Sequence, residues 1–158
     1  MSAVKAVGAA SAQGRPRPAG EVLQGARATW GVLLLAAPER VLRAVGEHHP
    51  DARTRAVLRV LGARHLVQAA FSGRAPGRAT LADGAWVDAV HALTSLALAA
   101  GDRPRARLAL LDAVVAASWG AASARAARRV PLDEAQAASW RERLARAVHP
   151  LLPGAPRL

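Results

Sequence analysis

Apolar residues along this chain gather in four long segments separated by short polar stretches rich in glycine and proline. The segments cover residues 21–46, 54–73, 81–101 and 105–129. Each is too long for an ordinary strand, and small or apolar side chains recur at the three- and four-residue spacing of a helix. The pattern therefore predicts four helices.

Proline and glycine mark where these helices should stop. Pro38 is expected to kink or end the first helix, because proline removes a backbone donor and clashes with the preceding turn. The sequence SGRAPGR ends the second helix, and Gly101 with Pro104 shortly after it ends the third. Short connections force neighbouring helices to be antiparallel, so the predicted fold is all-α, an up-down-up-down four-helix bundle.

Segments at both ends lie outside this bundle. Residues 1–20 mix small residues with glycine and proline and are predicted to be a flexible tail, while 21–129 form the helical domain. Residues 130–148 read as an amphipathic helix, and 149–158, with three prolines, as a second flexible tail. In the amphipathic helix an apolar stripe lies beside arginines; it is formed by Leu132, Trp140, Leu144 and Val148. This favours a helix lying on anionic headgroups, with a partner-binding helix as the competing interpretation.

Composition and charge narrow the chemistry. The chain has 22 Lys+Arg against 11 Asp+Glu, a formal net charge of +11, and no cysteine. The absence of cysteine excludes disulfides, thiolate metal ligands and thiol catalysis. The positive charge attracts polyanions. Because most arginines border apolar segments, anionic lipid headgroups are the favoured partner and nucleic acid is not.

The residue composition of the third and fourth predicted helices suggests a membrane protein. Each carries one internal acid, and the rest of its circumference is alanine, leucine, valine and serine rather than a polar face. The longest charge-free runs are 89–101, 113–124 and 28–38, all shorter than the ~20 residues that span a bilayer. We still expect a multi-pass protein of the plasma membrane. Twelve flanking cations on one side against eight on the other predict that both termini are cytoplasmic.

Each predicted helix contains one internal charge, and the four charges sum to zero. They are Arg27, Arg64, Asp88 and Asp112. Ionised groups in apolar surroundings face the bundle interior and pair with one another. Arg64, within VLGARHLVQAAF, is expected to pair with Asp88 first, with Asp112 as its other available partner.

Further polar residues share faces with these charges. Gln68 lies on the same helical face as Arg64, and His91 and Ser95 lie on the face of Asp88. The cluster is either a structural clasp that fixes which helices pair or a functional core, such as a proton relay or small-ligand site. The candidate binding residues are Arg27, Arg64, His65, Gln68, Asp88, His91 and Asp112.

No catalytic, nucleotide-binding or metal-binding motif is present, so no catalytic residue, metal or cofactor is predicted. His65 and His91 as axial ligands of a haem or a metal are an alternative interpretation. They lack the second ligand set or the attachment motif that would strengthen it.

Three stretches carry a resemblance to a known group: GVLLLAAPERVLRAVG, RVLGARHLVQA and DAVHALTSLALA. Together they resemble small four-helix integral membrane proteins of uncharacterised function from GC-rich bacteria, over residues 21–124. The resemblance implies topology and location only. We therefore expect a non-enzymatic accessory or transport-related membrane protein, with a second copy of itself or another membrane protein as its candidate partners. A membrane-embedded redox protein and a soluble basic protein that binds nucleic acid remain the alternatives.

Overall fold

The computed structural model describes residues 19–130 and 139–155, and every regular element within these ranges is a helix. The predicted all-α class is confirmed. The predicted N-terminal tail lies outside the described residues except for Ala19 and Gly20, which belong to the first helix. Residues 131–138, the first part of the predicted amphipathic helix, and residues 156–158 also lie outside them.

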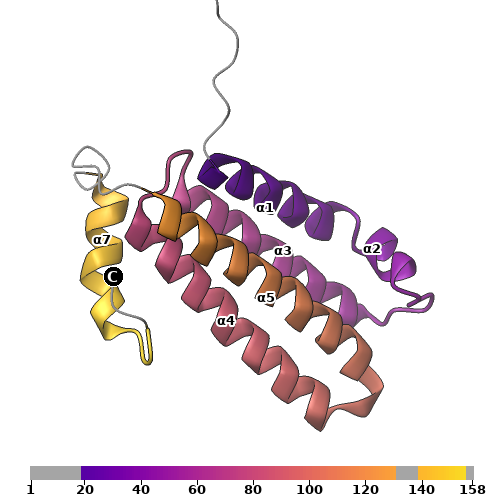
Figure 1. The fold of residues 1–158 in the computed structure, drawn as a ribbon. Helices are drawn as coiled ribbons and strands as arrows, with labels where there is room; N and C mark the ends of the chain where they lie inside the picture. The colour runs from indigo at the N-terminus through magenta and orange to yellow at the C-terminus, as the bar shows by residue number, and fades with distance from the viewer. Residues whose placement is uncertain (1–18, 131–138, 156–158) are drawn as a thin grey trace, which may run out of the picture.

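Four long helices lie side by side (Figure 1). They are α1 (Ala19–Ala36), α3 (Ala52–Ser72), α4 (Arg78–Gly101) and α5 (Ala106–Arg129). The short helix α2 (Pro38–Ala44) follows α1, and a 3-10 turn, η1 (Arg103–Arg105), joins α4 to α5. Pro38 ends α1 as expected and occupies the first position of α2, where its missing N–H has no helical partner to lose.

The helices pair through glycine and alanine. A Cβ on Gly31 of α1 would lie 2.8 Å from the Gly62 carbonyl oxygen of α3, so these two backbones are in direct contact. On α5, Gly120 lies against the backbone of α4, with Ala113 and Ala116 buried on the same helix. Small side chains therefore bring the helices close enough for polar groups on one helix to reach another.

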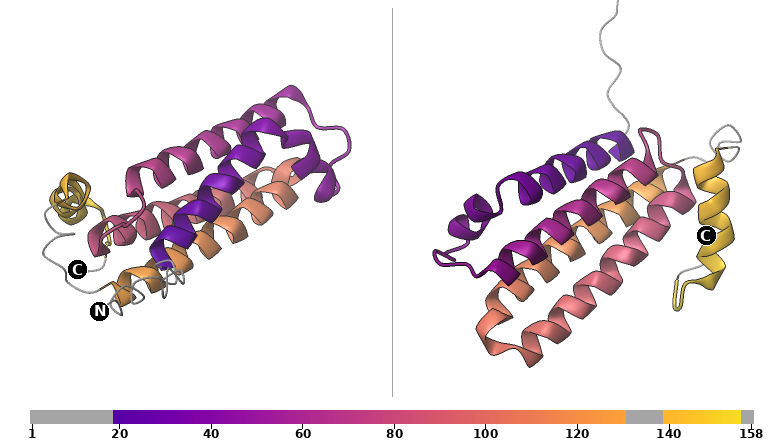
Figure 2. Two further views of the ribbon diagram at one scale, coloured as in Figure 1. Left: turned by 90° about the horizontal axis from the view of Figure 1, so that it is seen from above. Right: turned by 180° about the vertical axis from the view of Figure 1, so that it is seen from behind.

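A further helix, α7 (Trp140–Val148), stands across the end of the long helices where α3 finishes and α4 begins (Figures 1 and 2). The ring of Trp140, the first residue of α7, packs edge-on against the ring of Phe71 in α3, with 5.7 Å between ring centroids. The side chain of Ser139 accepts a hydrogen bond from the Glu142 N–H and caps the helix. The 3-10 turn η2 (His149–Leu151) follows, within the predicted C-terminal tail.

The prediction of a membrane protein is wrong. Among residues 19–130 and 139–155, each helix falls short of the length or the apolar character that crossing a bilayer demands. Charges interrupt the helices too often: α3 alone carries four arginines, Arg53, Arg55, Arg59 and Arg64. The expected transmembrane bundle, the plasma-membrane location and the cytoplasmic orientation of both termini depended on such spanning helices and are wrong for the same reason.

Candidate functional site

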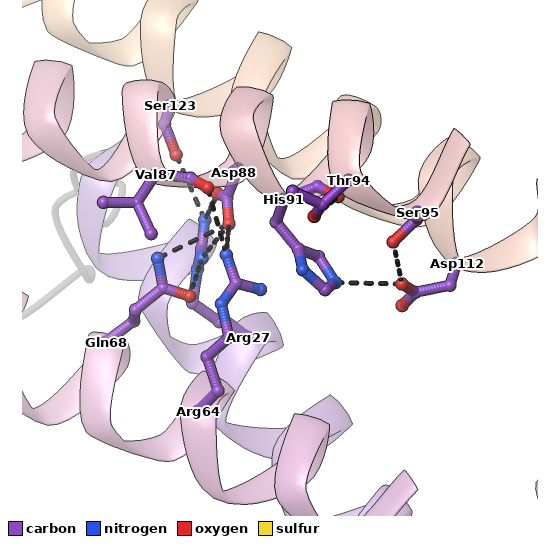
Figure 3. A network of polar contacts seen from close by, with 10 residues as sticks. All are labelled: Arg27, Arg64, Gln68, Val87, Asp88, His91, Thr94, Ser95, Asp112 and Ser123. Carbon is purple, nitrogen blue, oxygen red and sulfur yellow. Dashed lines mark hydrogen bonds and ion pairs between the residues drawn. The ribbon is translucent and has the colours of Figure 1, made fainter. Parts of the chain in front are cut away.

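Asp88 of α4 is the centre of a buried cluster of charges (Figure 3). Its side chain is fully inaccessible and accepts hydrogen bonds from two arginines. Arg27 Nη2 lies 2.6 Å from Asp88 Oδ2, and Arg64 Nη2 lies 2.9 Å from Asp88 Oδ1. We call Arg27, Asp88 and Arg64 the charge cluster. It joins α1, α3 and α4.

Arg27 is the more buried of the two arginines, with 1% of its surface exposed. Its Nη1 donates to Gln68 Oε1 at 2.8 Å, and its Nη2 also donates to Ser123 Oγ at 3.2 Å. The guanidinium lies over the ring of Trp119, 5.1 Å from its centroid, which adds a cation–π contact. Arg27 therefore ties α1 to all three of the other long helices.

The predicted Arg64–Asp88 ion pair is present, but it is the outer of two pairs. The Arg64 side chain keeps 21% of its surface exposed and also donates to the Val87 carbonyl oxygen at 3.4 Å. Sequence reasoning included Arg27 without assigning it a partner and did not include Ser123 or Trp119. The cluster contains two cations and one anion, because both arginines bond to the same carboxylate.

Asp112 lies in a separate polar contact on α4 and α5. Its Oδ2 is 2.9 Å from His91 Nε2 and accepts a hydrogen bond from Ser95 Oγ at 2.6 Å. Burial acts to raise the pKa of Asp112, but the hydrogen bonds from His91 and Ser95 outweigh it, so the pKa lies below its usual range. Asp112 thus pairs with His91 and not, as the sequence allowed, directly with Arg64.

His65 is buried, and its ring lies 6.2 Å from that of Trp119. Burial, followed by the positive charges of Arg27 and Arg64, lowers the pKa of His65 to about 4. The imidazole is therefore neutral near pH 7. The same positive surroundings oppose a metal cation at this ring. In the part of the chain that the structure describes, no group of three or more metal-ligating side chains is found.

A cavity of about 310 Å³ opens beside the charge cluster, between α1, α3, α4 and α7; we call it the α7 cavity. Its walls are mostly apolar, with Arg27, Gln68 and Ser123 at one side. Its lining residues include Gln24, Val67, Phe71, Thr80, Leu81, Asp83, Gly84, Val87, Leu144, Ala145, Val148 and Leu152. Two buried polar atoms of this lining, Gln24 Oε1 and Arg27 Nε, have no hydrogen-bond partner among the described residues.

Glu142 fixes α7 over this cavity. Its carboxylate is buried and accepts hydrogen bonds from the backbone N–H groups of Ala79 (2.9 Å) and Thr80 (3.1 Å) and from the Thr80 hydroxyl (3.0 Å). These donors belong to the first turn of α4, which has no capping side chain of its own. Gly77 permits the approach, because a Cβ there would collide with the Glu142 carboxylate. Glu142 is thus an N-terminal cap supplied by another helix.

A second anchor holds the other end of α7. His149 Nδ1 lies 2.5 Å from Asp83 Oδ1, and the Trp86 indole donates to the Pro153 carbonyl oxygen at 2.9 Å. Burial raises the pKa of Asp83, although the hydrogen bond with His149 opposes this shift. The apolar stripe predicted for this helix faces the cavity through Leu144 and Val148. None of these anchoring contacts was predicted, since each joins segments more than 60 residues apart.

Comparison with known proteins gave no match of the chain to a family model, to a curated protein or to a solved structure. The resemblance to small four-helix membrane proteins therefore stays a prediction that rests on the sequence motifs alone. The spanning helices that it implied are not found among the described residues.

Proposed function

We propose that this chain is a non-enzymatic binding protein, a four-helix bundle that holds one small, mostly apolar molecule in the α7 cavity. Arg27 of the charge cluster, together with Gln68 and Ser123, forms the polar wall of the site. A volume of about 310 Å³, apolar walls and a few converging polar groups are typical of small-molecule sites. Helix α7 closes the site from one side through Leu144, Ala145 and Val148.

The observation that carries this proposal is the pair of buried polar atoms without partners. Gln24 is 93% buried and Arg27 is 99% buried, yet Gln24 Oε1 and Arg27 Nε make no hydrogen bond to any described residue. Leaving such groups unsatisfied costs about 1–3 kcal/mol each, more for a charged group. The two residues lie three positions apart on α1, on one helical face. A ligand with a polar head would complete both.

A binding role fits the charge cluster better than catalysis does. Arg27 and Arg64 each donate to Asp88, at 2.6 and 2.9 Å, so these charges are held in place rather than left free to exchange protons with a substrate. Such fixed charges orient a ligand. The redox alternative loses support because the most enclosed histidine, His65, lies in positive surroundings.

Blocking the cavity tests the proposal. Gly84 lines the cavity, and no atom lies within 4 Å of a Cβ added there, so Gly84→Leu would fill space without a clash at that Cβ. Gly25→Leu on α1 is the matched control, since Gly25 has equal room for a Cβ and does not line the cavity.

The measurement is a nuclear magnetic resonance titration with two eight-carbon probes, 1-octanol and octanoate. We expect at least one probe to shift the amide signals of residues around the cavity in the native chain and in Gly25→Leu. Gly84→Leu should remain folded and show no shift. Binding that is unaffected by Gly84→Leu, or no binding of either probe to the native chain, would contradict the proposed function.

A further inference from the structure

We infer that the molecule held in the α7 cavity is an apolar monocarboxylate, whose anionic head binds at Arg27 and whose hydrocarbon tail lies against the cavity's apolar walls. This inference rests on the proposed function and adds the chemical class of the ligand.

The charge cluster has one cation too many. Arg27 and Arg64 share the single carboxylate of Asp88, and no other acid forms an ion pair with either arginine among the described residues. The one acid of α5, Asp112, bonds to His91 and Ser95 and acts on Arg64 only through space, without a direct bond to either arginine. An excess positive charge at a site as enclosed as Arg27 is unfavourable without a counter-ion. A bound anion supplies that counter-ion.

A free donor on the cavity wall points to the same chemistry. Arg27 has both Nη atoms occupied by Asp88, Gln68 and Ser123, and its Nε is a buried donor without a partner, as is Nη1 of Arg64, which does not line the cavity. A carboxylate accepts hydrogen bonds at both oxygens and donates none. Gln24 completes the match, because turning its side-chain amide by half a rotation presents N–H donors where Oε1 now lies.

The rest of the cavity is suited to a hydrocarbon chain. The apolar lining includes Val67, Phe71, Leu144 and Val148, which are 38–67% exposed, whereas Arg27 is 1% exposed. The one acid in the lining, Asp83, lies 2.5 Å from His149 on the α7 side and already has a partner. The arrangement places a cation at one side and apolar surface towards the opening, as an amphipathic anion requires.

Three probes of equal chain length separate this inference from the proposed function: octanoate, 1-octanol and octylammonium. Dissociation constants are measured at pH 7.5 by titration calorimetry on the full chain. We expect octanoate to bind at least about tenfold more tightly than 1-octanol, because hydrogen bonds to a charged group are about twice as strong as neutral ones. Octylammonium should not bind measurably.

A variant that removes the excess charge without altering the cavity wall provides the second arm. Arg64 does not line the cavity, and Arg64→Gln leaves the Arg27–Asp88 pair in place. We expect the affinity for octanoate to fall about tenfold in Arg64→Gln while that for 1-octanol is unchanged. Circular dichroism on the same sample verifies that the variant is folded.

Each outcome has one meaning. If 1-octanol or octylammonium binds the native chain as tightly as octanoate, the ligand class is wrong and the proposed binding function stands. If octanoate binds best but Arg64→Gln leaves its affinity unchanged, the charge argument is overturned. If no probe binds, both the inference and the proposed function fail.

Discussion

Arg27 on α1 and Asp88 on α4, 61 residues apart in sequence, form a two-bonded ion pair with N–O distances of 2.6 and 3.2 Å. Both side chains are at most 2% exposed. Removing two charges from water costs several kcal/mol per ion, and only close geometry and further hydrogen bonds offset that cost. Gln68, Ser123 and Arg64 provide those bonds. The four helices are therefore positioned around one buried pair.

The two arginines of the cluster should differ in their contribution to stability. Arg27→Ala removes a buried cation from a buried carboxylate, and we expect the free energy of unfolding to fall by about 3–5 kcal/mol. Arg64→Ala should cost only about 1 kcal/mol, because this side chain is 21% exposed and Asp88 keeps Arg27. Urea unfolding of both variants measures the difference. Equal losses, or a larger loss for Arg64→Ala, would show that the outer pair is the structural one.

Backbone contact between α1 and α3 predicts a steric effect at Gly31. Gly31→Ala places a Cβ 2.8 Å from the Gly62 carbonyl oxygen, and we expect a loss of roughly 1–3 kcal/mol. Gly25→Ala, on the same helix, meets no atom within 4 Å and should gain up to about 1 kcal/mol from helix propensity. Thermal unfolding compares the two. An equal gain of stability in Gly31→Ala and Gly25→Ala would contradict the backbone contact between α1 and α3.

Glu142 should control whether α7 remains attached to the other helices. Glu142→Ala leaves two backbone N–H groups and one hydroxyl of α4 without their acceptor, at a cost of about 1–3 kcal/mol. Amide hydrogen exchange within residues 140–148 should then become faster, while exchange in α5 is unchanged. Arg143→Ala, an exposed neighbour on α7, is the control and should leave exchange unaltered. Unchanged protection in Glu142→Ala would contradict the capping role.

The lowered pKa of His65 in the folded state should make the free energy of unfolding depend on pH. The unfolded imidazole has a pKa near 6.5 and the folded one near 4, so between these values only the unfolded state takes up the proton. Stability is thus fully present above pH 6.5 and declines as the pH falls towards 4, by at most about 3 kcal/mol for this group. His65→Gln lacks the titration. The loss of unfolding free energy between pH 7.5 and pH 4.5 should be smaller in His65→Gln than in the native chain; an equal loss assigns the effect to other groups.

The helices were predictable from the sequence because their signals are local. Long apolar segments, Pro38 and Gly101 define elements that the structure reproduces to within a few residues. The membrane assignment failed for a physical reason. It relied on alanine, leucine, valine and serine around the circumference of α4 and α5, but alanine also packs helices closely whatever surrounds them, and the buried residues of both helices include alanines. The length of an uncharged run was the better criterion, and no helix among residues 19–130 and 139–155 satisfied it.

The charge cluster was predictable in part. Isolated charges within apolar segments, such as Arg64 and Asp88, must find partners, and this reasoning identified the correct residues. It did not assign Arg27 to Asp88, because sequence positions fix the face of a helix but not how two helices are offset and rotated. The α7 cavity could not be predicted, because α7 forms one of its walls and the contact of Glu142 with the start of α4 joins segments far apart in the sequence.

The most direct test of the account is a double-mutant cycle between Arg27 and Asp88. The native chain, Arg27→Ala, Asp88→Ala and the double variant are unfolded in urea, and the coupling free energy is taken from the four values. We predict a coupling of about 2 kcal/mol or more, with the double variant less destabilised than the sum of the single ones. Additivity within about 0.5 kcal/mol would contradict the account, because it would mean that Arg27 and Asp88 do not hold each other in the interior of this protein.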